Sequence, residues 1–246
     1  MMPEGALFSV ILPTFNERQN IGPLIGAVLG ALRENVEVVV VDDDSPDGTG
    51  DVAAAICEGD PRVRLVRRRR GLGLASAIRD GVEAARGDLV AWMDCDFSMP
   101  PAALPAMRKA LDSVDIVVGS RYVGAAADRR DDRRAVLGSR LINGFARRLL
   151  GGTVTDFTSG FIAARKDAVT RLGIRDGYGE YCIDLLARAE RAGYRVAEIP
   201  YECVPRAAGE SKTATSWSGY LRRGWPYIRT IVQTWRGDGR EARPAR

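Results

Sequence analysis

The sequence predicts an α/β fold in which a mostly parallel β-sheet is flanked by helices. Continuous apolar runs, typical of strands buried on both faces, alternate with segments whose apolar residues recur every three or four positions. This alternation occurs five times, which calls for a parallel sheet with right-handed crossovers. Two apolar runs end in acidic residues, and sheets of this class bind ligands at the carboxyl ends of their strands.

Each element has its own signal. Apolar runs predict strands at residues 8–12, 36–41, 63–66, 89–93, 115–119, 161–164 and 195–201. Spacing by three and four predicts helices over 21–32, 101–111 and 135–150, and further helices begin near 49, 74 and 181. A helix from 217 to 235 is amphipathic and carries aromatic and arginine side chains. We expect a catalytic domain at residues 1–212, this amphipathic segment at 213–236 and a disordered tail at 237–246.

Composition limits the chemistry. The 246 residues suffice for one α/β domain with additions, and 46% of them are hydrophobic. There is no histidine, which excludes catalysis by a serine or cysteine paired with histidine and every metal site that contains histidine. The four cysteines form no Cys-x-x-Cys pair, so we expect a reducing, cytoplasmic setting. No signal pattern and no run of 18 apolar residues is present.

The net charge is +4, and the arginines gather in a few stretches. Arg67 to Arg70 precede Gly71 and Gly73 at a helix start, where backbone N–H groups can meet a phosphate. Residues 124–134 lack an apolar period and predict a mobile loop of functional importance. No nucleic-acid recognition motif accompanies these arginines, so no nucleic-acid partner is expected.

Asp94 and Asp96 follow the apolar run 89–93 and are the strongest candidate site. Side chains at positions i and i+2 leave an extended chain on the same side, so the two carboxylates converge at the end of the strand. A hard cation such as Mg²⁺ or Mn²⁺, shared with a substrate phosphate, suits such a pair. An acidic turn that faces solvent is the alternative for an Asp-x-Asp pattern taken alone.

A second acidic group follows the run 36–41. Asp43, and with it Asp42, is a candidate to accept hydrogen bonds from a ribose or base. Alternatively Asp44, Ser45 and Asp47 build the turn and cap the helix that begins near Thr49. Both interpretations can hold for different residues.

The order of these motifs is specific. Pro13-Thr14-Phe15-Asn16-Glu17 comes first, then the acidic group 42–49, Asp94-Cys95-Asp96, Gly119-Ser120-Arg121-Tyr122, Ser159-Gly160-Phe161 and Gly209-Glu210-Ser211-Lys212. In this order the chain resembles the family 2 glycosyltransferases of GT-A fold, and among them the polyprenyl-phosphate (dolichol-phosphate) mannosyltransferases. The likeness extends over residues 6–212.

The resemblance implies roles for individual residues. Asp94 and Asp96 would hold Mg²⁺ or Mn²⁺, and they form the catalytic set with Arg121 and Arg134. The donor-binding set would be Pro13, Phe15, Glu17, Val41, Asp43, Asp94, Cys95, Asp96, Arg121, Arg206 and Lys212. The chain departs from its relatives at Ser98, Met99, Pro205 and Asp131, and Arg134 stands five residues before Ser139 rather than four.

The resemblance implies an inverting transfer of a hexose, mannose from GDP-mannose, to a polyprenyl phosphate. A phosphate monoester is largely a dianion near pH 7 and needs no general base. Two alternatives are transfer to a saccharide or lipid hydroxyl, for which Asp156, Glu180 or Asp184 would serve as base, and a catalytically silent nucleotide-binding module. The expected enzyme is peripheral on the cytoplasmic face of a membrane, with residues 213–236 at the lipid surface. Packing of this segment on the domain competes with that interpretation, and a separate membrane subunit is left open.

Overall fold

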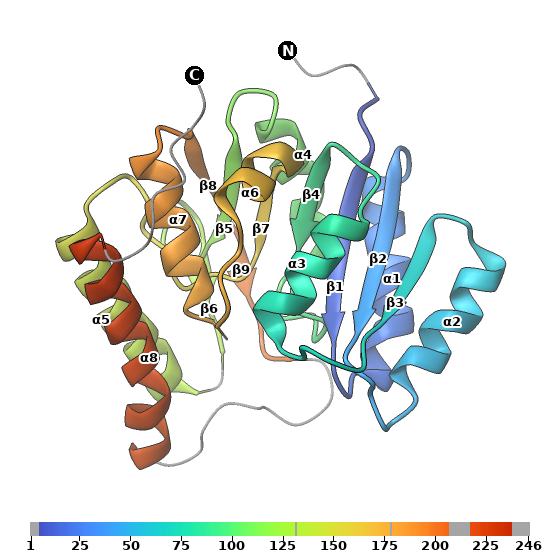
Figure 1. The fold of residues 1–246 in the computed structure, drawn as a ribbon, viewed down its shortest axis with the longest axis horizontal. Helices are drawn as coiled ribbons and strands as arrows, with labels where there is room; N and C mark the ends of the chain where they lie inside the picture. Colours follow the sequence, from blue (N-terminus) through green and yellow to red (C-terminus); the bar gives the residue numbers. More distant parts are fainter. Residues whose placement is uncertain (1–4, 131, 178, 207–216, 238–246) are drawn as a thin grey trace.

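The computed structural model describes residues 5–130, 132–177, 179–206 and 217–237 (Figure 1). The strands are β1 (Phe8–Thr14), β2 (Val36–Asp42), β3 (Val63–Arg67), β4 (Leu89–Trp92), β5 (Ile116–Ser120), β6 (Ala127–Asp128), β7 (Ile162–Arg165), β8 (Val196–Pro200) and β9 (Glu202–Cys203). The helices are α1 (Arg18–Leu32), α2 (Thr49–Gly59), α3 (Leu74–Ala84), η1 (Pro101–Ala103), α4 (Leu104–Ala110), α5 (Arg133–Leu150), α6 (Lys166–Leu172), α7 (Tyr181–Arg191) and α8 (Trp217–Arg236).

Seven strands form one sheet in the order β3-β2-β1-β4-β7-β5-β8. Strand β7 runs antiparallel to β4 and β5, and every other neighbouring pair in this sheet is parallel. Ile11 of β1 lies opposite Val39 of β2 and Trp92 of β4, so the three strands end at one edge of the sheet. The predicted α/β fold with a mostly parallel sheet is confirmed.

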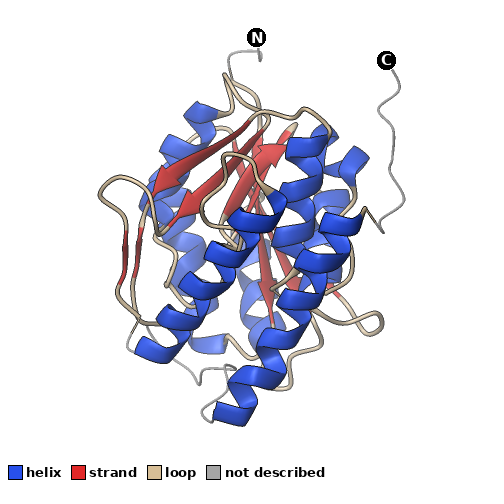
Figure 2. Ribbon diagram, turned by 90° about the vertical axis from the view of Figure 1, so that its left-hand side faces the viewer, coloured by secondary structure: helices blue, strands red, loops and turns tan. Residues whose placement is uncertain are grey.

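Helices cover both faces of the sheet, and each face has its own core (Figure 2). Fully buried Val10, Leu12 and Val38 face α1 and α4, whereas Ile11 and Trp92 face α3 and α7. Alternate residues of β1 therefore enter opposite cores, which explains why its sequence is apolar throughout.

One glycine sets how closely a helix approaches the sheet. A Cβ atom on Gly81 of α3 would lie only 2.3 Å from Cγ2 of Ile11. Any larger side chain there would push α3 away from β1 and widen the layer.

The observed elements differ from the predicted ones in several places. Residues 124–134, expected to form a mobile loop, contain β6, which pairs in parallel with β9. Helix α5 begins at Arg133, two residues before its predicted start, because the carboxylate of Asp132 accepts hydrogen bonds from two N–H groups of the first turn. Helix α6 and the short strands β6 and β9 were not predicted.

Helix α8 packs on the domain. It contacts α5 and α7, and the side chains of Ile231 and Thr234 are buried there. For residues 217–236 of the expected amphipathic segment the structure shows packing on the domain, while Trp225 and Trp235 stay exposed. In the part of the chain that is described, no helix combines the length and apolar character needed to cross a membrane. The predicted disordered tail lies almost wholly outside the described residues.

Candidate active site

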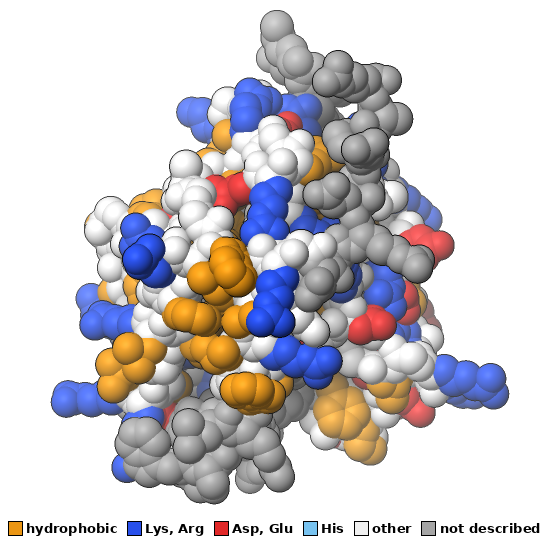
Figure 3. Space-filling view, turned by 60° about the vertical axis from the view of Figure 1, so that its left-hand side comes forward, with side chains coloured by type: hydrophobic (Ala, Val, Ile, Leu, Met, Phe, Trp, Pro, Cys, Tyr) orange, Lys and Arg blue, Asp and Glu red, His pale blue; other side chains and the backbone are white. Residues whose placement is uncertain are grey.

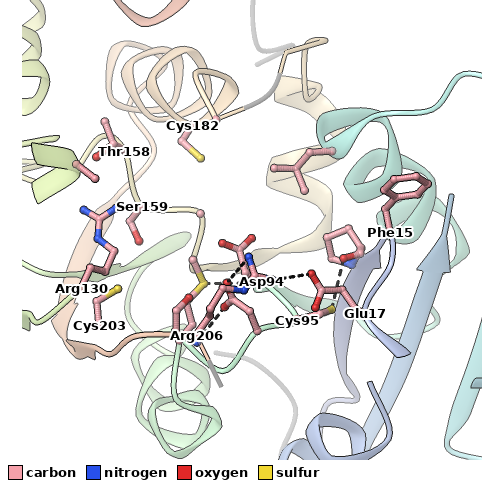
Figure 4. Close-up of a pocket in the computed structure, with 18 of the residues that line it drawn as sticks. Phe15, Glu17, Asp94, Cys95, Arg130, Thr158, Ser159, Cys182, Cys203 and Arg206 are labelled. Carbon is pink, nitrogen blue, oxygen red and sulfur yellow. Dashed lines mark hydrogen bonds and ion pairs between the residues drawn. The ribbon is translucent and has the colours of Figure 1, made fainter. Parts of the chain in front are cut away.

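A cavity of about 780 Å³ lies at the carboxyl ends of β1, β2, β4 and β5 (Figure 4). Most of the residues expected to bind the donor line it. These are Pro13, Phe15, Glu17, Asp43, Asp94, Cys95, Asp96, Arg121 and Arg206. Segments far apart in the sequence thus meet in one cavity.

The acidic pair occupies a turn rather than the strand itself. Strand β4 ends at Trp92, and the Oδ1 atom of Asp96 accepts the N–H of Ser98 at 3.0 Å. Between them Cys95 is buried and donates its thiol to the carbonyl of Pro13 at 3.4 Å, which fixes the turn on β1. Both carboxylates line one cavity, as expected, although they lie on a turn and not on an extended strand.

The site is electrostatically strained without a cation. Burial, and after it the neighbouring carboxylates of Asp96 and Glu17, raise the pKa of Asp94, whereas Arg206 and Arg121 oppose the rise, and the resulting pKa is about 6. Two carboxylate ligands at one edge of a sheet, with room for a diphosphate beside them, fit Mg²⁺ or Mn²⁺. No group of three or more acidic or cysteine ligands that could hold a metal ion occurs among the described residues. A pair of carboxylates leaves coordination positions for water and for oxygens of a substrate.

Arg206 lies against this acidic group. Its Nη2 atom lies 3.0 Å from Oε1 of Glu17, and its Nη1 atom lies 3.8 Å from Oδ2 of Asp96. Figure 4 shows Glu17, Asp94 and Arg206 facing one another. Arg206 follows β9, so the strand pair β6–β9 fixes the start of its loop. Lys212, its expected companion, lies outside the described residues.

A buried network fixes the part of the cavity wall that Asp43 forms. Oδ1 of Asp43 accepts a hydrogen bond from Nη1 of Arg68, and Oδ2 accepts the N–H of Gly73, both at 2.8 Å. Burial raises the pKa of Asp43, and these two donors oppose the rise. Phe15 and Leu72 present exposed apolar surface beside this wall, as a flat nucleoside would require.

The neighbouring acidic residues have structural roles. Asp42 is buried and accepts hydrogen bonds from the N–H and hydroxyl of Ser45, and Asp47 accepts the N–H and hydroxyl of Thr49. The turn interpretation is therefore right for Ser45 and Asp47, whereas the N-cap of α2 is Gly48, and no side chain caps the helix from that position. Val41 lies wholly in the core, and its side chain does not line the cavity.

Arg121 is buried and held in place by other side chains. Its Nε and Nη2 atoms donate to the two oxygens of Asp156 at 2.8 and 2.7 Å, and Nη2 also donates to Thr158. Burial disfavours the charge, but Asp156 outweighs it and keeps the pKa of Arg121 above its ordinary value. Arg121 therefore forms a fixed part of the cavity wall and gives that wall a positive charge.

The loop before α5 contributes an arginine that sequence reasoning did not select. Arg130 lines the cavity and binds Asp128 through Nε at 2.8 Å and Nη2 at 2.6 Å. Arg134, the predicted residue, is exposed on the first turn of α5 and does not line the cavity. Both arginines lie in one arginine-rich stretch of the sequence. The pairing of β6 with β9 positions Arg130 at the cavity, and this pairing is not visible in the local sequence. In Figure 4, Arg130 lies on the side of Asp94 opposite Phe15.

Comparison with known proteins agrees with this geometry. Residues 9–173 match the family model described as glycosyl transferase family 2. A polyprenol monophosphomannose synthase from Mycolicibacterium smegmatis is 37% identical over 216 residues, which cover 84% of this chain and 81% of the relative. An undecaprenyl-phosphate mannosyltransferase from Micrococcus luteus is 36% identical over 213 residues, which cover 82% of this chain and 85% of the relative.

Among solved structures, a glucosyl-3-phosphoglycerate synthase from Mycobacterium tuberculosis, in complex with Mn²⁺, UDP and glucosyl-3-phosphoglycerate, superposes with a TM-score of 0.70. It is 25% identical, and the match covers 94% of this chain and 80% of that one. Another crystal structure of that synthase contains Mg²⁺ and UDP. The fold is thus that of the GT-A enzymes, and the chain belongs to glycosyl transferase family 2.

Proposed function

We propose that this glycosyltransferase transfers a hexose, mannose from GDP-mannose, to a polyprenyl phosphate with inversion at the sugar carbon. The printed names of the relatives in Mycolicibacterium smegmatis and Micrococcus luteus support a mannosyl donor and a polyprenyl phosphate acceptor. The observation that carries the proposal is the division of one cavity into an acidic side and an arginine side.

The acidic side is suited to the donor. Asp94 and Asp96 would hold Mg²⁺ or Mn²⁺, which would neutralise charge on the diphosphate leaving group. Arg206 lies close enough to exchange its contacts with Glu17 and Asp96 for contacts with that diphosphate. Phe15 and Asp43 would bind the nucleoside, together with Pro13, and Lys212 remains a proposed second cation for the diphosphate.

The arginine side is suited to a phosphate acceptor. Arg130 and Arg121 line it, together with the hydroxyl-bearing Thr158 and Ser159. An oxygen of the acceptor phosphate would attack the sugar carbon, while the bond to the diphosphate breaks and the leaving group keeps the electron pair. The arginines would orient the nucleophile, and no proton has to be removed from it.

A hydroxyl acceptor fits less well, because it needs a general base. Asp156 is bound by Arg121, and Asp184 forms ion pairs with Arg175 and Arg188. Among the described residues that line the cavity, neither of these acids nor Glu180 is present. The three bases offered by the sequence are therefore poorly placed for a hydroxyl.

A donor and acceptor screen tests the proposal. The full chain would be incubated with Mn²⁺ and GDP-mannose, UDP-glucose or UDP-galactose in turn, with undecaprenyl phosphate or a manno-oligosaccharide as acceptor. Mass spectrometry should detect a mannosyl phosphoprenol with GDP-mannose, and no product with Asp94→Asn. Transfer to the oligosaccharide alone would refute the phosphate acceptor, and transfer from UDP sugars alone would refute the mannose donor.

A further inference from the structure

A second concave surface lies on the other side of Arg121 from the active-site cavity. It is a groove of about 410 Å³ between α5 and the segment after β5. The residues that line it are Arg121, Tyr122, Gly124, Ala126, Arg140, Asn143, Gly144, Arg147 and Thr155. Because Arg121 borders both spaces, the groove adjoins the acceptor side of the active site.

Two arginines of this groove form no ion pair within the described part of the chain. Arg140 and Arg147 are exposed, and seven residues apart on a helix they lie on the same side, two turns from each other. Among the described residues no carboxylate lies within ion-pair distance of either, and α5 contains five arginines and no acidic residue. Their charges are therefore available to an external anion.

The other polar groups of the groove are already satisfied. The amide nitrogen of Asn143 donates to Thr158 and to the carbonyl of Ser139, and its oxygen accepts the N–H of Phe157. The hydroxyl of Tyr122 donates to Ser139. An anion bound here would therefore be held chiefly by the two guanidinium groups, whose planar donors match phosphate oxygens.

An apolar stripe runs along α5 beside these arginines. Leu137, Leu141 and Phe145, spaced by four, have 56%, 66% and 38% of their surface exposed. Figure 3 shows apolar side chains bordered by basic ones on the side of the molecule that carries α5 and α8. An arginine-rich helix with an exposed apolar stripe matches a lipid–water interface better than it matches bulk water.

We propose that this groove binds the phosphate headgroup of an anionic phospholipid, with Arg140 and Arg147 as its ligands and the stripe on α5 inserted among the acyl chains. Charge complementarity selects this occupant, since α5 supplies only positive charge and the adjoining stripe requires an apolar phase. The first turn of α5 lines the catalytic cavity through Ala135, so a bilayer along this helix would bring a lipid acceptor to the active site.

Phospholipid binding by this groove rests on the proposed function only because a polyprenyl phosphate acceptor places the enzyme at a membrane. The groove can fail to bind phospholipid even if the proposed transfer is correct. Vesicle sedimentation would compare the full chain with Arg140→Gln/Arg147→Gln on phosphatidylcholine, with and without phosphatidylglycerol. We expect the wild type to bind only the anionic vesicles. The double variant should bind them roughly 30-fold more weakly, since each basic residue near an anionic surface contributes about 1 kcal/mol.

The matched control removes the same charge elsewhere. Arg33→Gln/Arg86→Gln replaces two exposed arginines near the amino-terminal ends of β2 and β4, at the edge of the sheet opposite the active site. This control should keep vesicle binding within about twofold. Leu137→Ser/Leu141→Ser, which leaves every charge in place, should weaken binding by roughly tenfold or more, because two exposed apolar side chains no longer enter the bilayer.

The source of the phosphate is tested by competition, and function is tested in solution. Excess inorganic phosphate at constant ionic strength should not displace the protein from anionic vesicles; displacement would indicate a free-phosphate site and overturn the lipid assignment. Equal binding by wild type and Arg140→Gln/Arg147→Gln would also overturn it. Arg140→Gln/Arg147→Gln should transfer the sugar to water-soluble geranyl phosphate, assayed without vesicles, as fast as the wild type does. If the wild type itself shows no such transfer, the proposed function is refuted, and the lipid-binding groove is not.

Discussion

Nη2 of Arg206 lies 3.0 Å from Oε1 of Glu17, although 189 positions separate the two residues. Nη1 of the same side chain lies 3.8 Å from Oδ2 of Asp96. This contact joins the segment after β9 to the loop between β1 and α1 across the active-site cavity. Because Glu17, Asp94 and Asp96 repel one another, a cation among them lowers the electrostatic cost of the ionised site. We expect a divalent metal ion and Arg206 to share these acidic groups.

Replacing Arg206 with glutamine should affect sugar transfer and metal binding differently. Transfer should fall about 100- to 1000-fold in kcat/KM, because charge on the departing diphosphate loses a stabilising donor. The affinity of the donor-free protein for Mn²⁺ should stay the same or rise, because a competing cation is gone. Electron paramagnetic resonance of free Mn²⁺ and steady-state kinetics measure the two quantities. A wild-type rate in this variant would show that Arg206 does not contribute to transfer.

Metal affinity should depend on pH through Asp94. The pKa of this carboxyl is raised to about 6, and only its ionised form binds a divalent ion. Below that pH, Mn²⁺ affinity should fall by about tenfold per pH unit, whereas above pH 7 it should be nearly constant. Titration calorimetry at several pH values between 5 and 8 checks this. An affinity that begins to fall only below pH 4 would mean that Asp94 has an ordinary pKa in the protein.

The same raised pKa predicts that the active site lowers stability. Folded Asp94 keeps its proton up to about pH 6, whereas the unfolded residue releases its proton near pH 3.8. Ionised Asp94 therefore lowers the free energy of unfolding of the metal-free protein, fully above pH 6 and not at all below pH 3.8. Asp94→Asn should therefore raise the free energy of unfolding at pH 7 by about 1 to 3 kcal/mol. Urea titrations at pH 7 and pH 4 test this, and the gain should vanish at the lower pH. A gain of equal size at both pH values would point to packing rather than charge.

Arg121 and Asp156 should behave as a structural unit. Both side chains are buried, so removing one partner leaves an uncompensated charge, at a cost of about 3 to 5 kcal/mol. Arg121→Met or Asp156→Leu alone should be strongly destabilised, and the double variant should lie closer to the wild type than either single variant does. Urea unfolding of the four proteins gives the coupling energy. Purely additive losses would show that the two residues act independently.

The sequence was sufficient to predict the parallel part of the fold and the acidic half of the site. Strands such as β1 and β4 are buried on both faces, so their apolar runs identify them without help from the rest of the chain. Asp94 and Asp96 follow such a run directly, and their place at the sheet edge depends only on where β4 ends. These features arise from local sequence.

Long-range contacts decided what the sequence did not predict. The antiparallel direction of β7 depends on its partners β4 and β5, which are far from it in the chain. Strand β6 has only two residues, and its pairing with β9 orders a stretch that has no apolar period. Val41 was assigned to the donor site through the resemblance alone, yet its side chain is fully buried in the core between β2 and α3.

The two candidate arginines of the acceptor loop, Arg130 and Arg134, should differ in their effect on acceptor binding. Arg130 lines the cavity, whereas Arg134 points from the exposed first turn of α5. Arg130→Gln should raise KM for a prenyl phosphate by about tenfold or more, because a charge-assisted bond to phosphate contributes roughly 1.5 to 3 kcal/mol. Arg134→Gln should change it less. The KM for the nucleotide sugar is the internal control, because Arg130 lies away from Phe15 and should leave it unchanged in both variants. If Arg134→Gln has the larger effect on the acceptor, then α5 and its loop must rearrange when the acceptor binds, and the residue inferred from the resemblance is the right one.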